Sequence, residues 1–310
     1  MVKHFLRDDD LSPAQQREVL QLAVELRNNR FQSRPLTGPQ AVAVILDKPT
    51  LRTQVSFATG IAELGGYPLL VDGKLAQIGV RESIADTTRV LDRQVAAIVW
   101  RTYGQERIDE MAGLSRVPVI NALTDQFHPC QILADLAAVA DLRGGVDQLP
   151  GLTLTYVGDG ANNMAHSYLL GGVTAGLHVR ICAPEGYLPQ DDIVQKAEEI
   201  ATQTGGSVLV TSDLAAAAAG ADVLATDTWV SMGMADEDGQ RQQVFGPYQL
   251  NAAVLGLAKS DAQVLHCLPA YRGKEVSAEV LDGPQSIIWD EAEYRLHAQK
   301  ALITWLLEQA

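Results

Sequence analysis

The sequence predicts an α/β protein made of two doubly wound domains, each a parallel sheet flanked by helices. Short apolar runs alternate with segments whose apolar residues recur every three or four positions. The runs are apolar on both faces, which is typical of parallel strands covered by helices on both sides. The alternation is interrupted near the middle by DLRGGVDQLPG (141–151), rich in glycine, and 310 residues suffice for two ordinary domains.

Ten apolar runs are the candidate strands, and we expect right-handed crossovers between them. They are, in order, 41–46, 68–72, 96–100, 117–120, 152–157, 178–183, 207–210, 221–226, 263–268 and 286–289. Four precede the glycine-rich interval and six follow it. We therefore expect a first domain over 1–144 and a second over 150–290. A long closing helix, 291–310, begins after the capping residue Asp290, and its apolar residues are predicted to pack back on the first domain.

Charge and cysteine content narrow the class of protein. Acidic residues outnumber basic ones by 38 to 24, a net charge of −14, which argues against binding to nucleic acid or to an anionic membrane. The three cysteines are far apart, which predicts a reducing compartment without a disulfide framework. No signal-peptide core and no apolar stretch of membrane-spanning length is present, so we expect a cytoplasmic protein.

The exit of the first strand carries the strongest local signal, because ligands of open parallel sheets bind at the carboxyl ends of strands. Residues 47–54 read DKPTLRTQ, and a helix is predicted to begin at 50–53 and to run to about Leu64. A helix N-terminus offers unpaired N–H groups, Thr50 and Thr53 add hydroxyls, and Arg52 adds a guanidinium suited to phosphate. The alternative is an N-cap threonine beside an exposed arginine.

Further polar groups follow the next strands of the first domain. Arg101 comes directly after the third strand, and His128 and Gln131, in FHPCQ, lie at the start of a helix. A surface ion pair for Arg101 and a capping role for His128 are the structural alternatives. Taken together, the two arginines, the histidine and the hydroxyls predict a site for a phosphorylated ligand that carries a carbonyl group.

The second half carries a different set of groups. VGDGANNM (157–164) lacks the third glycine of a dinucleotide fingerprint, so we expect no nicotinamide cofactor and no oxidoreductase. Asn163 offers an amide to a carboxylate. Asp227, at a strand end, and Ser231 suit an ammonium group, although an aspartate there is more often a helix cap.

The tetrapeptide HCLP (266–269) ends the ninth strand and is predicted to present Cys267 to the ligand. The structural alternative is a small buried apolar side chain. We expect no zinc site, because His266 and Cys267 should alternate between the two faces of a strand and no spaced Cys/His partners exist.

Six motifs in this order resemble the aspartate/ornithine carbamoyltransferase family, and DTWVSMG and HCLP resemble its ornithine-specific branch. They are PTLRTQ, HPCQ, GDGANNM, DTWVSMG, HCLPAYRG and EAEYRLHAQKA, which together cover nearly the whole chain. The resemblance implies transfer of the carbamoyl group of carbamoyl phosphate to the δ-amine of L-ornithine, giving L-citrulline and phosphate, within arginine biosynthesis. It further implies a homotrimer with sites near subunit interfaces, and neither metal nor organic cofactor.

The resemblance also implies roles for individual residues. The carbamoyl-phosphate ligands would be Thr50, Leu51, Arg52, Thr53, Gln77, Arg101, His128, Gln131, Cys267, Leu268 and Arg295, of which Arg52, Arg101, His128 and Cys267 would be catalytic. The ornithine ligands would be Asn163, Asp227, Ser231 and Met232. Gln77, in AQIG, would reach the site of a neighbouring subunit.

Three positions depart from the family pattern. Thr50 and Leu51 stand where the family has serine and threonine, and Tyr294 stands where related sequences usually carry asparagine. These departures leave open a transferase for another amine (putrescine, lysine or an N-acylated ornithine) and a catalytically weak member with a regulatory role.

Overall fold

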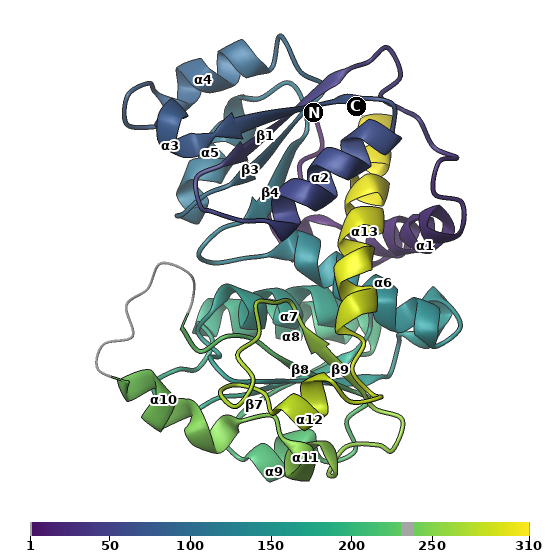
Figure 1. Ribbon diagram of the computed structural model, residues 1–310, viewed down its shortest axis with the longest axis vertical. Helices are drawn as coiled ribbons and strands as arrows, with labels where there is room; N and C mark the ends of the chain where they lie inside the picture. The colour runs from purple at the N-terminus through teal and green to yellow at the C-terminus, as the bar shows by residue number, and fades with distance from the viewer. Residues whose placement is uncertain (1, 231–238, 310) are drawn as a thin grey trace. The chain divides into compact units, whose positions relative to one another are not determined.

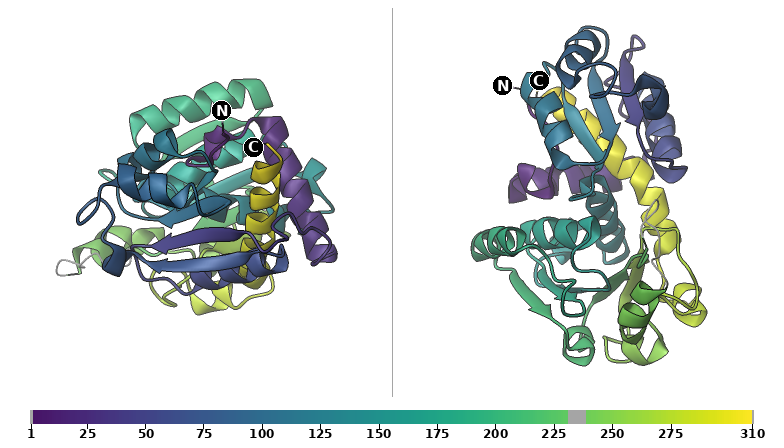
Figure 2. Two further views of the ribbon diagram at one scale, coloured as in Figure 1. Left: turned by 90° about the horizontal axis from the view of Figure 1, so that it is seen from above. Right: turned by 90° about the vertical axis from the view of Figure 1, so that its left-hand side faces the viewer.

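The computed structural model describes residues 2–230 and 239–309, and the chain divides into two compact units (Figure 1). Unit 1 comprises Met1–Ala137 with Ala292–Ala310, and unit 2 comprises Ala138–Glu291. Each unit is a parallel sheet with helices on both faces, which confirms the predicted α/β class (Figure 2). No helix in the described parts of the chain is long and apolar enough to span a membrane.

The sheet of unit 1 has four parallel strands in the order β2-β1-β3-β4. They are β1 Ala41–Leu46, β2 Tyr67–Asp72, β3 Ala97–Arg101 and β4 Val119–Leu123. Leu46 pairs with both Asp72 and Arg101, so three strands end at the same level. The loops that follow β1, β2 and β3 therefore emerge side by side at one edge of the sheet.

Helices cover both faces of this sheet. They are α1 Pro13–Asn28, α2 Arg52–Glu63, α3 Gly73–Ala76, α4 Ile84–Leu91, α5 Gln105–Leu114, the first part of α6 Pro129–Leu142 and, from Ala292 onward, α13 Ile288–Glu308. On one face α4 and α5 pack together over Ile45, Ile98 and Trp100. On the other face α2 packs against α13, and Gly60 allows the approach, because a Cβ there would meet Leu296 and Lys300 at 3.3 and 3.1 Å.

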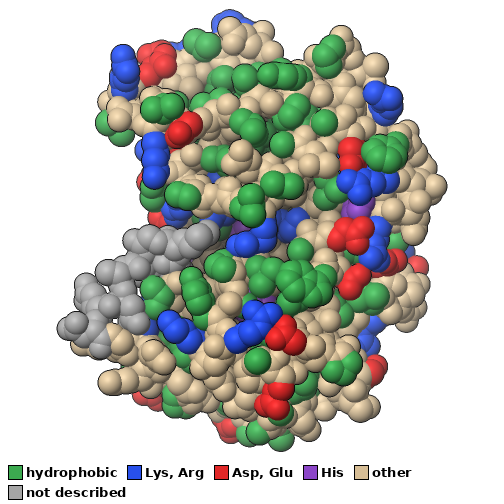
Figure 3. All heavy atoms as spheres, in the orientation of Figure 1, with side chains coloured by type: hydrophobic (Ala, Val, Ile, Leu, Met, Phe, Trp, Pro, Cys, Tyr) green, Lys and Arg blue, Asp and Glu red, His purple; other side chains and the backbone are tan. Residues whose placement is uncertain are grey.

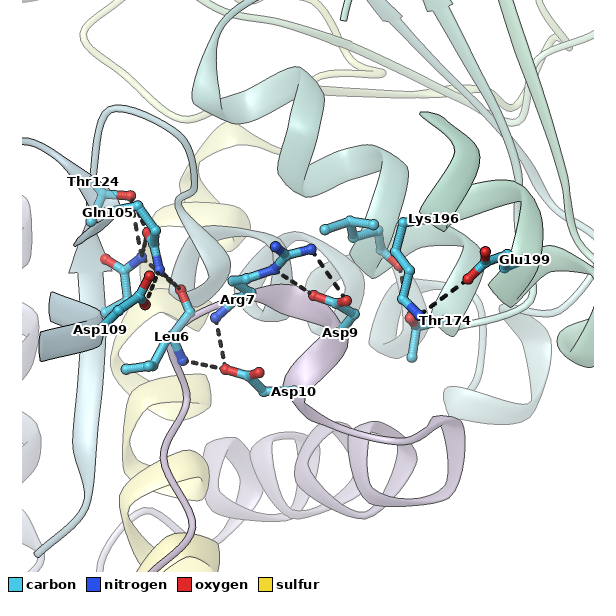
Figure 4. Close-up of polar contacts among 12 residues, drawn as sticks. Leu6, Arg7, Asp9, Asp10, Gln105, Asp109, Thr124, Thr174, Lys196 and Glu199 are labelled. Carbon is cyan, nitrogen blue, oxygen red and sulfur yellow. Dashed lines mark hydrogen bonds and ion pairs between the residues drawn. The ribbon is translucent and has the colours of Figure 1, made fainter. Parts of the chain in front are cut away.

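The N-terminal segment closes the β4 edge of the sheet. Phe5 pairs with Ile120, and the backbone nitrogens of Leu6 and Arg7 donate to the Asp10 carboxylate (Figure 4). Gln105 donates to the Leu6 carbonyl, which fixes the segment to α5. The opposite edge, β2, has no such cover among the described strands.

The sheet of unit 2 has five parallel strands in the order β7-β6-β5-β8-β9. They are β5 Thr153–Val157, β6 His178–Cys182, β7 Ser207–Thr211, β8 Val223–Thr226 and β9 Gln263–His266. The helices are α7 Asn163–Thr174, α8 Asp191–Thr204, α9 Leu214–Ala218, α10 Gln240–Phe245, α11 Ala252–Leu255 and α12 Ala278–Leu281. Helices α7 and α8 pack together on one face, and α9, α11 and α12 enclose Leu224 and Val264 on the other.

Nine of the ten predicted strands form, and the prediction of a strand at 286–289 is wrong. Only Ser286 makes a bridge, with Val264, and the apolar residues that follow open α13 instead. Strand β4 begins two residues later than predicted, since Pro118 has no N–H to donate to a ladder. The predicted return of the C-terminal helix to the first unit is confirmed.

A buried ion pair joins α13 to α2. The Lys300 side chain is fully buried, and its Nζ lies 2.8 Å from Glu63 Oε2 and donates to the Arg30 carbonyl. Arg30 also contacts Glu63, at 2.6 Å. Desolvation pushes the pKa of Glu63 upward, but the bonds from Arg30 and Lys300 outweigh it and hold that pKa below its ordinary value of 4.5.

We expect Glu63→Gln to lower the free energy of unfolding by roughly 2 kcal/mol at pH 7, because Lys300 stays buried without its carboxylate. A depressed pKa stabilises the fold above the unfolded-state pKa, and this contribution is lost as pH falls through the folded-state value. The difference from the wild type should therefore shrink below about pH 4.3. Urea unfolding followed by circular dichroism at pH 7 and pH 4 would measure it, and a difference of equal size at both pH values would contradict the assignment.

Candidate active site

The loop after β1 leads directly into α2 and forms the first part of the candidate site. Arg52 is the first helical residue, and the backbone N–H of Thr53 points at Thr50 Oγ1, 3.4 Å away. Thr53 is buried, whereas the Leu51 side chain is 74% exposed and makes no capping bond. Leu51 is the N-cap residue of α2, and its exposed side chain offers no hydroxyl there, so position 51 can contribute only its backbone N–H to a ligand.

Arg101 and His128 lie beside this helix N-terminus. Arg101 is the last residue of β3, and His128 directly precedes α6; both side chains are buried. Desolvation, together with the positive charges of Arg295, Arg101 and Arg52, holds the pKa of His128 well below its usual range. The imidazole is therefore neutral at neutral pH, which suits it to donate to a carbonyl oxygen rather than to carry charge.

Arg295, on α13, connects α6 and α2. Its two terminal nitrogens donate to Gln131 Oε1 at 2.5 Å and to Thr53 Oγ1 at 3.4 Å. Gln131 Nε2 donates in turn to the Asp135 carboxylate at 2.7 Å, and Asp135 is fully buried. This chain fixes the orientation of the Gln131 amide. Unit 1 thus brings together Thr50, Arg52, Thr53, Arg101, His128, Gln131 and Arg295.

Tyr294 and Gln77 lie outside this cluster. The Tyr294 ring is buried with the Arg27 guanidinium 5.2 Å above its centroid and His297 edge-on at 6.0 Å. The Tyr294 side chain therefore packs between α13 and α1 within unit 1. Gln77 is exposed, directly after α3, and adopts the left-handed conformation with φ 50° and ψ 45°.

In unit 2 the exits of β8 and β9 meet. Cys267 Sγ donates to Asp227 Oδ1 at 3.2 Å, and the Thr228 backbone N–H donates to the same oxygen at 2.7 Å. Desolvation raises the pKa of Asp227, against the opposing effects of His266 and of these two donors. Ser231 and Met232 lie outside the described residues.

The expectation that His266 and Cys267 face away from each other is wrong. The ligand atoms of Asp227, His266 and Cys267 all lie within 4.8 Å of one another. Strand β9 ends at His266, and Leu268 turns into the left-handed region with φ 58°, so the alternation of a strand no longer applies.

Both ring nitrogens of His266 are nevertheless engaged by the protein. Nδ1 accepts from the Leu268 backbone N–H at 3.0 Å, so Nε2 carries the proton and donates to Glu275 Oε1 at 3.1 Å. His266 could therefore ligate a metal ion only by breaking one of these bonds. The pair instead fixes the backbone of the HCLP turn, because Glu275 also accepts from the Tyr271 N–H.

Asn163 opens α7, at the exit of β5. The preceding residue, Asn162, caps the helix by accepting from the Ala165 N–H at 2.9 Å, and its Nδ2 donates to the Tyr156 hydroxyl at 2.8 Å. Desolvation raises the pKa of Tyr156 well above its usual range, so this hydroxyl stays protonated. These contacts hold the turn that places Asn163 half-buried at the helix N-terminus.

Three buried supporting residues were not found by sequence reasoning. Asp135 lies four residues after Gln131 on the same helix, a spacing that could have revealed it. Tyr156 and Glu275 carry no comparable signal, because each reaches its partner through a turn.

Comparison with known proteins assigns both halves of the chain to one family. Residues 3–141 match the aspartate/ornithine carbamoyltransferase carbamoyl-P binding domain, and residues 150–306 match the Asp/Orn binding domain of the same family. The ornithine carbamoyltransferase of Leifsonia xyli subsp. xyli is 61% identical over 307 residues, covering 99% of this chain and 97% of the relative. That of Bifidobacterium longum subsp. infantis is 58% identical, covering 100% and 96%.

Comparison of the fold with solved structures indicates the same family. The ornithine carbamoyltransferase of Pyrococcus furiosus superposes with a TM-score of 0.94 at 38% identity, covering 99% of this chain and 98% of that chain. That of Gloeobacter violaceus gives 0.88 at 42% identity, covering 98% of both. The chain therefore belongs to the aspartate/ornithine carbamoyltransferase family.

Proposed function

We propose that this chain transfers the carbamoyl group of carbamoyl phosphate to the δ-amine of L-ornithine, forming L-citrulline and phosphate in arginine biosynthesis. The observation that carries the proposal is the cationic cluster of unit 1. In a chain of net charge −14, Arg52, Arg101 and Arg295 gather around one helix N-terminus and a neutral His128. Such a cluster suits an anion, and a phosphate with an adjacent carbonyl group matches both its guanidinium donors and its neutral imidazole.

The domain spanning 1–144 together with the helix 291–310 would bind carbamoyl phosphate. Arg52, Thr50 and the N–H groups of α2, that of Leu51 included, would hold the phosphate oxygens. Thr53, Arg101 and His128 would donate to the carbonyl oxygen, on which negative charge develops during attack. Gln131 and Arg295 would complete this part of the site. A neutral His128 is suited to this role, since it donates without adding a fourth positive charge.

The domain spanning 150–290 would bind ornithine. Asp227 would accept from the α-ammonium group, and Asn163 would donate to the carboxylate, while Ser231 and Met232 would add the remaining ornithine contacts. Cys267 and Leu268 would contact the reacting groups, Leu268 through its backbone. The His266–Glu275 pair supports this proposal, because it fixes the turn from which both residues emerge.

The reaction is a simple substitution at the carbamoyl carbon. The δ-amine must be neutral to attack, although its pKa in water is near that of lysine, about 10.4. A desolvated site disfavours the ammonium form and so supplies the nucleophile. The new C–N bond forms, the C–O bond to phosphate breaks, and the leaving phosphate accepts the proton that the amine gives up. The activated mixed anhydride supplies the driving force, so we expect no cofactor.

We propose that the protein is a homotrimer in which Gln77 completes the site of a neighbouring subunit. The uncovered β2 edge supports an interface there, since an exposed apolar edge strand is otherwise an aggregation hazard. Tyr67 is 58% exposed, and Leu75 and Val80 in the following loop are 79% and 81% exposed. Hydrophobic side chains are visible on the surface of this unit (Figure 3). Light scattering should give three times the chain mass of 33.4 kDa.

The function is tested by offering a panel of acceptors with carbamoyl phosphate: ornithine, lysine, putrescine, aspartate and acetylornithine. We expect carbamoylation of ornithine with the highest kcat/KM, because Asp227 and Asn163 together recognise a free α-amino acid. Preference for putrescine or acetylornithine would establish a transferase for a different amine. An inactive protein that still binds carbamoyl phosphate would instead identify a regulatory family member.

We expect two substitutions to affect the kinetics of the two substrates differently. Arg52→Ala should lower kcat/KM at least hundredfold without loss of fold, since it removes a charged donor to the phosphate. Asp227→Asn should raise the KM for ornithine roughly ten- to hundredfold and change that for carbamoyl phosphate far less. Initial-rate kinetics with each substrate varied would measure both effects. Equal effects of Asp227→Asn on the two KM values would contradict the assignment of ornithine to unit 2.

We expect Leu51→Thr to leave the KM for carbamoyl phosphate within about twofold of the wild type. The Leu51 side chain is 74% exposed, so an added hydroxyl would face the solvent, and surface changes of this kind are usually worth less than about 0.5 kcal/mol. Val55→Thr, on the exposed face of the same helix, is the matched control. A tenfold change confined to Leu51→Thr would show that this side chain acts on the phosphate.

A further inference from the structure

We propose that Arg107, on α5, is a positioning residue. It holds the segment between β2 and α4 (residues 73–83, here called the Gln77 loop) in the conformation in which Gln77 can reach the carbamoyl-phosphate site of the neighbouring subunit. This inference rests on the proposed role of Gln77 and adds the group that holds it in place. Arg107 belongs to none of the motifs that identify the family, and no ligand contact is required of it. Its guanidinium instead links the loops that follow β2 and β3, the two strands on either side of β1.

The contacts of Arg107 define its position. One terminal nitrogen donates to the Ile78 backbone carbonyl at 2.7 Å, and Nε donates to Thr102 Oγ1 at 3.0 Å. The guanidinium lies 5.2 Å from the centroid of the Trp100 ring. The planar fork therefore spans from the residue directly after Gln77 to the loop directly after β3, a bridge that a single ammonium group could not reproduce.

Asp47 anchors the other end of this bridge. Thr102 Oγ1 and Trp100 Nε1 donate to Asp47 Oδ2 at 2.7 and 3.0 Å, and the Arg107 guanidinium lies 3.7 Å from the same oxygen. Asp47 is buried and comes directly after β1, on the stretch that leads to Thr50 and Arg52. The loop that carries the phosphate ligands and the loop that carries Gln77 are thus tied to one carboxylate.

The start of the Gln77 loop also approaches Asp47 closely. A Cβ on Gly73, at the start of α3, would lie 2.0 Å from Asp47 Oδ1, so only glycine allows this contact. Figure 1 shows α3 and α5 near each other at the end of unit 1.

The conformation of the loop explains why it needs a clamp. Gln77 and Gly79 both adopt positive φ angles, of 50° and 76°, and glutamine rarely does so. Between them Ile78 is buried in the core formed by β1, β3, α4 and α5, while its carbonyl accepts from Arg107. The loop is therefore held at Ile78 by its side chain and by its carbonyl, and Gln77 is presented outward. Loss of the carbonyl contact would leave the left-handed turn supported only by the buried Ile78 side chain and by its own backbone bonds.

The test compares Arg107→Met with Arg107→Lys and with the control Arg116→Met. Methionine keeps the apolar length over Trp100 but donates nothing, whereas lysine keeps the charge and can reach only one partner at a time. Arg116 pairs with Asp92 in the same unit and has no bond to the Gln77 loop. We expect Arg107→Met to raise the KM for carbamoyl phosphate roughly ten- to hundredfold through misplacement of Gln77. The KM of Arg107→Lys for carbamoyl phosphate should lie between those of the wild type and Arg107→Met. The KM of Arg107→Met for ornithine should change far less, and Arg116→Met should leave both KM values close to those of the wild type.

Mixed oligomers test whether the loop acts on a neighbour. Arg107→Met chains keep an intact Arg52 but present a displaced Gln77, whereas Arg52→Ala chains have the reverse defect. Hybrids of the two should recover activity well above the average of the separate parents, because an intact Gln77 loop then reaches an intact Arg52 site. If Arg107→Met chains do not form oligomers, the same hybrid experiment is done with Arg107→Lys and Arg52→Ala chains.

The outcomes separate this inference from the proposed function. An unchanged KM in Arg107→Met, together with a raised KM in Gln77→Ala, would overturn the role of Arg107 and leave that of Gln77 standing. No effect from either variant would overturn both. A raised KM without recovery in the hybrids would show that the loop serves its own chain, which contradicts the inference as stated.

Discussion

The site of unit 1 depends on one electrostatic constraint: an acidic chain brings three guanidinium groups, those of Arg52, Arg101 and Arg295, close to one buried histidine at the N-terminus of α2. Burial lowers the pKa of His128, and the positive charges of Arg295, Arg101 and Arg52 lower it further. Positive charge is thereby concentrated at one place in unit 1, and the helix dipole of α2 adds to it. This concentration is what suits the cluster to the proposed phosphate ligand.

The sheet supplies the geometry that this constraint requires. Because Leu46 pairs with both Asp72 and Arg101, the loops after three strands start from one level, and each contributes part of the site or its support. Asp47 is the point at which they meet, through Trp100, Thr102 and the close approach of Gly73. A buried carboxylate with several donors is costly to form and therefore allows little movement of the loops around it.

Sequence reasoning predicted the groups that would touch ligands and missed those that support them. Arg52, Arg101 and His128 were predictable, because strand exits and a helix start can be read from local patterns. The Glu275 partner of His266 and the Arg107 bridge were not, because both pairs form through turns whose conformation depends on the folded chain. The wrong expectation for His266 and Cys267 has the same origin: it assumed a strand that continues, whereas Leu268 leaves it with φ 58°. Likewise, the apolar character of 286–289 could not show that Ile288 would begin a helix instead of lying in a strand.

The neutral state of His128 removes one source of pH dependence from the proposed reaction. His128 stays neutral near pH 7, because burial and the neighbouring positive charges hold its pKa well below the usual range. It therefore neither gains nor loses a proton there. The amine, with a pKa near 10.4 in water, must be deprotonated before it attacks, and the phosphate can accept the proton released. In the proposed reaction the protein would desolvate the amine and hold the carbonyl oxygen among fixed donors. Both are tasks for a preorganised site rather than for a titrating acid or base.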